Sequence, residues 1–130
     1  MISWQELSKY NNDNPPTSNL GRTNDVENQY TIFKTSFVKK KISISDYIYT
    51  KYFSGTNKRY IIVPNHFPYK LEQNITHNLL WINPKITFNK SEIIGIINRN
   101  FDTNNIIYFE NITEYKSVKE IRHIHIFVKN

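Results

Sequence analysis

The sequence predicts an α+β fold in which N-terminal helices pack on a mostly antiparallel sheet of about four or more strands. Up to residue 55 the apolar residues recur at helical spacing, and from residue 56 onward short apolar runs are bounded by Asn, Pro and Gly. Helices and strands that are segregated along the chain favour an antiparallel sheet. The 130 residues suit a single domain, with a helical part at 1–55 and a sheet-forming part, containing one helix, at 56–130.

Three helices are expected in the first part of the chain. Ser3 and Glu6 form the pattern of a capping box, which predicts a short helix to about Tyr10. The stretch 11–25 consists largely of turn-forming residues, so we expect a long loop with a functional or docking role. A second helix should follow, because apolar residues recur there at steps of four, three and four; they are Val26, Tyr30, Phe33 and Phe37.

This second helix should end at the lysine run 39–41, where positive charge suits a helix C-terminus. Ser45 is the candidate cap of a third helix, which should stop at Ser54 and Gly55. Apolar alternation and turn residues then indicate four strands. The expected strands are 59–65, 76–83, 104–111 and 122–129, and a helix capped by Ser91 separates the two pairs.

The composition favours a partner that carries negative charge. The formal net charge is +6 and the isoelectric point is near 9.5, which suits a nucleotide or phosphorylated sugar, with nucleic acid as an alternative partner. The one dense run of charge, Lys39 to Lys41, fits a solvated helix end. The chain is rich in Ile, Asn and Lys and has no Ala, as AT-rich coding DNA would produce, so part of the charge reflects composition.

Several classes of site are excluded by residues that the sequence lacks. There is no Cys, which removes disulfides, thiolate nucleophiles and zinc ribbons. The 3 Gly form no phosphate-binding loop, and no serine-centred nucleophile elbow is present. Neither a cleavable leader nor a run of 18 apolar residues is visible, so we expect a cytoplasmic protein with no membrane partner.

Histidine is the residue type left to carry chemistry, and two of the four histidines lie in the last predicted strand. Because side chains alternate along a strand, His123, His125 and Phe127 should share one face, with about 7 Å between neighbours. The aliphatic residues between them should be buried against the helices. Two imidazoles on one face can point into a common cleft, as they do in phosphate chemistry and in metal sites.

His77 lies in another predicted strand, and it joins this pair if the two strands are neighbours. A hydrogen-bonded structural role is the alternative for each histidine. A metal site of His77, His123 and His125 is a further alternative, because three imidazoles bind zinc or iron, although no carboxylate is clearly placed to support them. No cofactor is predicted apart from this divalent metal.

Aromatic residues gather between residues 65 and 81. Phe67, Tyr69 and Trp81 can form a stacking platform for a base or a sugar. An ordinary corner of the core accounts for the same cluster equally well. His66, in a turn-like segment close to Pro64, is expected to be exposed and incidental to any site.

Short motifs follow one another along nearly the whole chain: SWQEL, NLGRT, YTIFK, DYIYTKYF, NHFPY, HNLLW, FENI, KSV and HIHIF. Their order and spacing resemble the N-acetylglucosamine-induced protein family, a domain of unknown function best represented in fungi. An acid usually stands in that family where this chain has His66. The matching positions are Trp4, Leu20, Gly21, Arg22, Tyr30, Asn65, Pro68, Tyr69, His77, Trp81, Asn111, Ser117, His123 and His125.

The C-terminal part is also similar, more weakly, to the histidine-triad and galactose-1-phosphate uridylyltransferase superfamily. Asn111, Ser117 and the His-Ile-His of 123–125 carry this second resemblance. It implies that His125 attacks the α-phosphate of a nucleotide, that His123 orients it, and that Asn111 or Ser117 donates to the phosphate. Phe127 stands where the superfamily has a third polar residue, which is consistent with a site that binds without catalysing.

Three functions follow from these patterns. The first is a histidine-dependent nucleotide or nucleotide-sugar hydrolase or transferase, with His77, His123 and His125 as catalytic residues. The second is a non-catalytic module that binds a phosphorylated sugar, a nucleotide or RNA, and the third is a histidine-ligated metal enzyme. The candidate substrate-binding residues are Arg22, Asn65, Tyr69, Trp81, Asn111 and Ser117.

Overall fold

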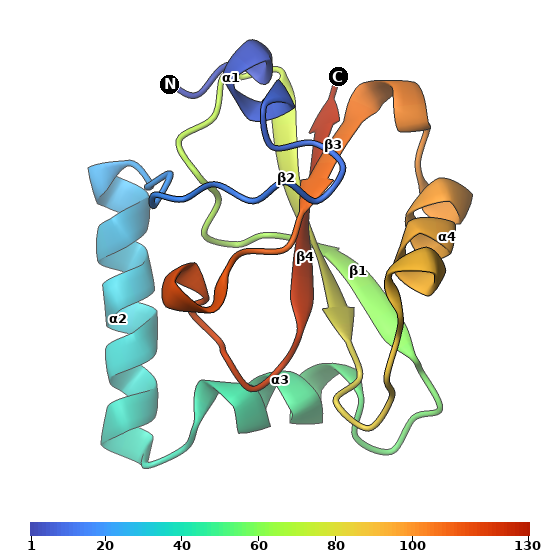
Figure 1. The fold of residues 1–130 in the computed structure, drawn as a ribbon. Coiled ribbons are helices and arrows are strands. Elements are labelled where there is room, and N and C mark those ends of the chain that lie inside the picture. The colour runs from blue at the N-terminus through green and yellow to red at the C-terminus, as the bar shows by residue number, and fades with distance from the viewer.

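The computed structural model describes all residues from 1 to 130 and has an α+β fold (Figure 1). The predicted order of three helices, two strands, one helix and two strands is confirmed, with two short 3₁₀ helices added. The elements are α1 (Trp4–Ser8), α2 (Asn24–Lys40), α3 (Ile44–Tyr52), β1 (Tyr60–Pro64), β2 (Ile75–Ile82), α4 (Lys90–Asn100), η1 (Thr103–Asn105), β3 (Ile106–Phe109), η2 (Thr113–Tyr115) and β4 (His123–Lys129). None of the helices combines the length and the apolar character that crossing a membrane requires.

Two helices begin two residues earlier than the sequence predicted. The cap of α3 is Ser43 and not Ser45, and the cap of α4 is Asn89 and not Ser91. At α4 the Asn89 side chain accepts from the backbone N–H of Glu92, whose carboxylate accepts from the backbone N–H of Asn89. Each of these helices has two short polar residues near its N-terminus. The earlier one is the cap, because its side chain accepts a hydrogen bond from a free N–H group of the first turn.

The four strands form one sheet in the order β1-β2-β4-β3, and every neighbouring pair is antiparallel. The prediction of a mostly antiparallel sheet is thus confirmed. The β2–β4 register places Trp81 opposite His123, Leu79 opposite His125 and His77 opposite Phe127. Residues directly opposite in an antiparallel pair point to the same side, so all three histidines lie on one face of the sheet.

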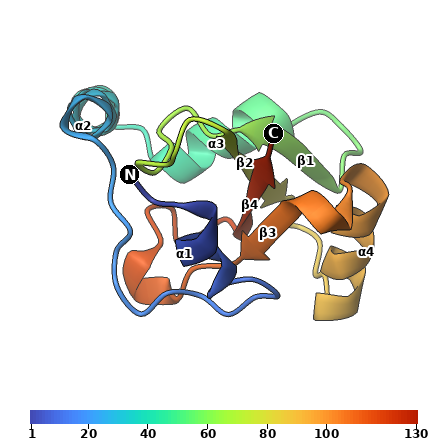
Figure 2. The ribbon, with the colours of Figure 1, turned by 90° about the horizontal axis from the view of Figure 1, so that it is seen from above.

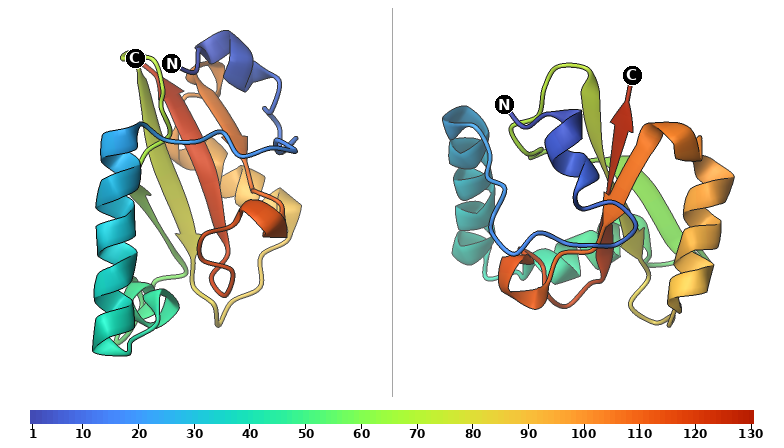
Figure 3. Two further views of the ribbon diagram at one scale, coloured as in Figure 1. Left: turned by 90° about the vertical axis from the view of Figure 1, so that its left-hand side faces the viewer. Right: turned by 45° about the horizontal axis from the view of Figure 1, so that its top comes forward.

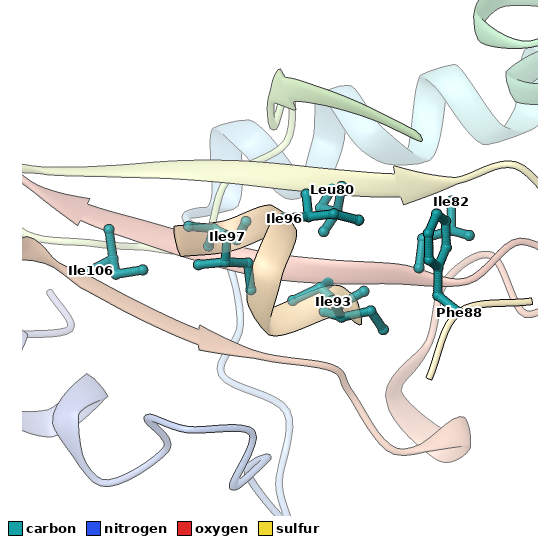
Figure 4. Close-up of a cluster of buried hydrophobic side chains, with 9 residues drawn as sticks. Leu80, Ile82, Phe88, Ile93, Ile96, Ile97 and Ile106 are labelled. Atoms are coloured by element: carbon teal, nitrogen blue, oxygen red, sulfur yellow. The ribbon is translucent and has the colours of Figure 1, made fainter. Parts of the chain in front are cut away.

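The other face of the sheet is aliphatic and is covered by α4, as Figure 4 shows. Ile124 and Ile126 of β4 are buried there, which confirms the predicted alternation in this strand. Isoleucines of α4 pack against them because three fall on one side of the helix. The cluster consists of Leu80, Ile82, Phe88, Ile93, Ile96, Ile97, Ile106, Ile124 and Ile126.

The histidine-bearing face is covered by two separate groups of buried residues. One lies under α1 and includes Leu7, Phe109 and Phe127, and the other lies under α3 and includes Ile48 and Trp81. Helix α2 stands beside the sheet on the side opposite to α4 (Figures 1 and 2). This arrangement leaves the middle of the face, where β4 carries its histidines, bordered by α2 and α3 rather than filled by them.

Helix α2 is held in place by aromatic contacts with α3 and with the connection between β1 and β2. The ring of Tyr30 stacks on Phe67 with centroids 4.8 Å apart, and Phe37 meets Tyr47 of α3 at 4.9 Å. Phe33 contacts both partners, at 5.1 Å from Phe67 and 6.0 Å from Tyr47. These rings form a wall that stands off from the sheet.

The loop between α1 and α2 runs past β3 to reach α2, as can be followed in Figure 3. It is fixed by hydrogen bonds: Tyr108 donates its N–H to Asn11 Oδ1, and Asp13 donates its N–H to the Tyr108 carbonyl. Further along, the Tyr115 hydroxyl of η2 donates to the carbonyl of Thr17 at 2.7 Å. The long loop therefore docks on the sheet edge and carries Arg22 to the histidine-bearing side.

Candidate functional site

A cavity of about 360 Å³ lies on the histidine-bearing face, between the sheet, α2, α3 and the η2 segment. Its walls are rich in aromatic residues, and two cationic side chains, Arg22 and Lys51, reach it. None of the 23 residues that line it is an Asp or a Glu. The aromatic side chains are Tyr30, Phe33, Tyr47, Tyr52, Phe67, Tyr69, Trp81 and Tyr115.

Most of the residues that the sequence singled out meet at this cavity. Only His77 does not line it, because its ring lies behind that of His125. His66, which was expected to be incidental, is exposed but also lines the cavity. The predicted residues that line it are Arg22, Asn65, Tyr69, Trp81, Asn111, Ser117, His123 and His125.

The rings of His77 and His125 are joined directly. His77 Nε2 lies 2.7 Å from His125 Nδ1, and the backbone N–H of Tyr69 donates to His77 Nδ1 at 3.2 Å. Burial lowers the pKa of His77 to about 3, and burial also lowers the pKa of His125 well below its usual value. Both imidazoles are therefore neutral at pH 7.

Asn111 connects His125 to Tyr69 at the floor of the cavity. Its amide group lies 2.9 Å from the Tyr69 hydroxyl and 3.2 Å from His125 Nε2. Burial raises the pKa of Tyr69, so its hydroxyl keeps its proton and is available as a donor. Asn111 therefore belongs to the hydrogen-bonded network around His125.

His123 has a different environment from its neighbour two residues on. Its Nδ1 lies 3.1 Å from the carbonyl oxygen of Ile121, and its ring packs on Trp81 with centroids 4.5 Å apart. Burial lowers the pKa of His123, so this ring is also neutral near pH 7. Its Nε2 makes no hydrogen bond to the protein.

Arg22 is largely buried and is the principal cation of the site. Its Nε donates to the carbonyl of Phe67 at 2.7 Å, and its guanidinium lies 4.5 Å from the ring centre of Tyr30 and 5.8 Å from that of Tyr69. An ion pair with Glu27 at 3.5 Å uses one end of the group. The guanidinium group of Arg22 is thus held in place, and its remaining N–H groups can bind an anion.

Asn65 and Ser117, two of the candidate substrate-binding residues, line the cavity, but neither is a buried residue. Asn65 Oδ1 accepts from the backbone N–H of Phe67 at 2.9 Å, which fixes the turn after β1. Its Nδ2 approaches His77 only to 3.5 Å. Ser117 is exposed and makes no hydrogen bond, so it lies at the rim of the cavity.

Sequence reasoning missed the wall that α3 contributes. Lys51 lies over the rings of Tyr47 and Tyr52, at 5.6 and 5.4 Å from their centres. Tyr47 and Lys51 are four residues apart, a spacing that places them on one side of a helix. That signal was present in the sequence, but the sequence does not show that α3 faces β4.

The metal site that the sequence left open is not formed. His77 Nε2 and His125 Nδ1 face each other at hydrogen-bond distance, which leaves no room for an ion between them. No group of three or more His, Asp or Glu side chains is arranged to hold a metal ion. Phe127 also lies outside the cavity, fully buried against His77 at 4.5 Å, so it does not replace a ligand-facing residue.

Comparisons with known proteins bear on the whole chain. The family model described as "Protein of unknown function (DUF3605)" matches residues 3–129. The chain belongs to this family. It is 31% identical over 86 residues to N-acetylglucosamine-induced protein 1 of Candida albicans, a match that covers 53% of this chain and 34% of that protein. The resemblance to the N-acetylglucosamine-induced protein family is thereby confirmed.

The match thus spans about a third of the length of that curated relative. A solved structure described as the crystal structure of HTC1 has a similar fold, with a TM-score of 0.72 and 15% identity. The similarity covers 100% of this chain and 86% of that chain. At this identity the comparison shows the fold alone.

Proposed function

We propose that this chain binds a small ligand of the nucleotide or phosphorylated-sugar class in the cavity beside β4. The observation that carries this proposal is the composition of the cavity wall: eight aromatic residues, two cations, and no carboxylate among the 23 lining residues. A wall of this kind attracts negative charge and offers flat surfaces to a base or a sugar.

Arg22 and Lys51, the two cations of the cavity, differ in exposure. One ligand can therefore contact a buried charge at one end and an exposed charge at the other. Arg22, with 13% of its side chain exposed, presents a rigid fork inside the wall. Lys51, by contrast, is exposed on α3. A phosphate group bound by Arg22 would gain charge-assisted hydrogen bonds that a neutral ligand cannot form.

The size of the cavity supports a small molecule over a polymer. A volume of about 360 Å³ falls in the range of small-molecule sites, roughly 300–1,000 Å³. The rings of Trp81 and His123, tilted by 38° against each other with centroids 4.5 Å apart, offer aromatic faces beside it. The end of an RNA strand is the competing occupant, and the experiment below includes it.

A second candidate function is catalysis on the same ligand by a histidine-dependent hydrolase or transferase. Its supporting observation is that His123 and His125 both line the cavity and are both neutral, because burial lowers their pKa values. A neutral imidazole can act as a base or as a nucleophile toward phosphorus.

A thermal-shift panel tests the binding proposal. It compares AMP, UDP-N-acetylglucosamine and N-acetylglucosamine 6-phosphate with adenosine, N-acetylglucosamine and a short 5′-phosphorylated RNA. The amino sugar is included because the name of the Candida albicans relative records induction by it. At least one phosphorylated small molecule should raise the melting temperature, and its uncharged counterpart should not. A flat response to all of them contradicts the proposal, and stabilisation by RNA alone replaces it.

Two lysine variants locate the bound ligand. Lys51→Gln should weaken binding by about three- to tenfold, the effect of losing one partly exposed charge contact. Lys34→Gln is the matched control, because Lys34 also lies over an aromatic ring, 4.4 Å from the centre of Tyr30, but does not line the cavity. Equal loss in both variants would point to general charge rather than to this cavity. Assaying each bound compound for turnover then separates catalysis from binding alone.

A further inference from the structure

Building on the proposed function, we infer that His123, and not His125, is the histidine that acts on a ligand in the cavity, with its Nε2 as the free proton acceptor of the site. The resemblance to histidine-triad proteins placed this role on His125. The hydrogen bonds of the two rings place their protons on opposite nitrogens, which gives them different chemistry.

The proton positions follow from one backbone donor. The amide N–H of Tyr69 can only donate, so His77 Nδ1, 3.2 Å away, is an acceptor and carries no proton. A neutral imidazole then has its proton on Nε2, and His77 Nε2 donates across 2.7 Å to His125 Nδ1. His125 therefore accepts at Nδ1 and carries its own proton on Nε2.

A protonated Nε2 has no lone pair for nucleophilic attack or for proton removal. In His125 this nitrogen donates toward Asn111, 3.2 Å away. The structure places Asn111 Nδ2 at this position, and the proton count calls for Oδ1, which a half-turn of the amide provides. In that orientation Oδ1 accepts from both His125 Nε2 and the Tyr69 hydroxyl, so the side-chain protons of His77, His125 and Tyr69 all have acceptors.

His123 has the opposite arrangement. The carbonyl of Ile121 can only accept, so His123 Nδ1, 3.1 Å away, carries the proton and donates it. The lone pair is then on Nε2, which has no partner in the protein. No buried side-chain nitrogen or oxygen of the chain lacks a partner, so this Nε2 must have access to the cavity that His123 lines.

These positions define what His123 can do to a phosphate ester. In hydrolysis, the oxygen of a water molecule forms a bond to phosphorus while the bond from phosphorus to the leaving oxygen breaks. The leaving oxygen keeps the electron pair of that bond, and the proton of the water passes to His123 Nε2. The Ile121 carbonyl holds the Nδ1 proton throughout, and the Trp81 ring packs against the imidazole.

Long-range ¹H–¹⁵N correlation spectra of the histidine side chains test the inference without any ligand. At pH 7.5 His123 should show a protonated Nδ1 and an unprotonated Nε2. His77 and His125 should both show the reverse, and the His123→Asn variant assigns the signals. A spectrum in which His125 carries its proton on Nδ1 would overturn the inference.

Acylation by diethyl pyrocarbonate, read by peptide mass spectrometry, supplies a second measurement. The reagent attacks unprotonated imidazole nitrogens that it can reach, so the exposed His66 and the cavity-facing His123 should be modified. His77 and His125 should stay unmodified, because their unprotonated nitrogens accept hydrogen bonds inside the protein. Modification of His125 ahead of His123 contradicts the inference.

A failure of the proposed function has a different signature. If AMP protects His123 from acylation, binding and inference both stand. If no compound of the panel binds, the proposed ligand class is wrong, while the proton positions and the acylation pattern still decide which histidine is reactive.

Discussion

His77 Nε2 and His125 Nδ1 lie 2.7 Å apart across the β2–β4 pair, and both rings are buried. The contact depends on the strand register. Because His77 lies opposite Phe127 and Leu79 lies opposite His125, His77 and His125 are diagonal neighbours on one face of the sheet. The contact links the protein core under α1 to the floor of the cavity. This hydrogen bond therefore joins the packing of the core to the position of His125 in the cavity wall.

Replacing His77 should destabilise the protein strongly. His77→Ala removes a buried ring that stacks on Phe127 and leaves the Tyr69 N–H and His125 Nδ1 without partners. We expect the free energy of unfolding to fall by about 3 kcal/mol. Urea denaturation at pH 7.5 measures this, with exposed His66→Ala as a control that should stay within about 0.5 kcal/mol of the native protein. Similar losses in both variants would show that the buried contacts of His77 do not stabilise the protein.

Stability should decrease as the pH falls below 6.5. In the unfolded chain His77 binds a proton near its usual pKa of 6.5, whereas burial keeps it neutral in the folded protein down to about pH 3. The unfolded state therefore binds more protons in this window, and unfolding becomes easier by about 1.4 kcal/mol per pH unit for this residue. Urea midpoints from pH 7.5 to 4.5 provide the measurement.

The same titration with His77→Gln isolates this histidine. The variant lacks the titrating group. The number of protons taken up on unfolding should therefore be smaller by about one than in the native protein, and the free energy of unfolding should depend on pH less steeply. His123 and His125, whose pKa values burial also lowers, still contribute to the remaining slope. Identical slopes in both proteins would show that His77 is not held neutral.

The sequence predicts the order of elements and the face of β4 that carries histidine because both follow from local periodicity. Ile124 and Ile126 alternate with His123 and His125, and alternation alone separates the two faces. The caps of α3 and α4 were misplaced because each helix start offers two short polar residues within three positions, and their side-chain geometry decides between them.

The cavity could be predicted only in part, because its walls meet through non-local packing. The contact of His77 with His125 requires the β2–β4 register, and the position of Lys51 requires α3 to lie against the sheet. Neither relationship leaves a mark in the local sequence. For Phe127 the sequence suggested a ligand-facing position, because it follows His125 by two residues on the same face of β4. In the structure α1 covers this end of the face, so Phe127 is buried.

The segment between β3 and β4 should loosen when Glu110 loses its charge. Its carboxylate accepts from Arg122 at 3.0 Å and from Lys116 at 3.0 Å, and only 16% of its side chain is exposed. Glu110→Gln should lower the free energy of unfolding by about 1–3 kcal/mol and increase amide hydrogen exchange in residues 112–121. Ligand affinity should fall as well, because this segment carries Tyr115 and Ser117 to the cavity.

Glu114→Gln is the control for this prediction. Glu114 lies in the same segment, is exposed and forms no ion pair. Its exchange pattern and stability should match those of the native protein. If both variants exchange alike, the ion pairs of Glu110 do not hold the segment.

Phe127 should matter for stability and not for the ligand. Phe127→Ala removes a fully buried ring between His77 and Phe109, which should lower the free energy of unfolding by about 3–5 kcal/mol. Phe127→Leu should lose less, because more of the volume is kept. Calorimetric titration of Phe127→Leu should give the native affinity, and a large loss of affinity would place this residue at the site after all.

Backbone ¹H–¹⁵N NMR during titration with AMP and N-acetylglucosamine 6-phosphate decides whether the cavity beside β4 binds a small phosphorylated ligand. With at least one of them, chemical-shift changes should cluster at Arg22, Tyr69, Asn111 and His123 and should leave the lysine run 39–41 unchanged. Changes centred on that lysine run, or no changes with either compound, would contradict binding in this cavity.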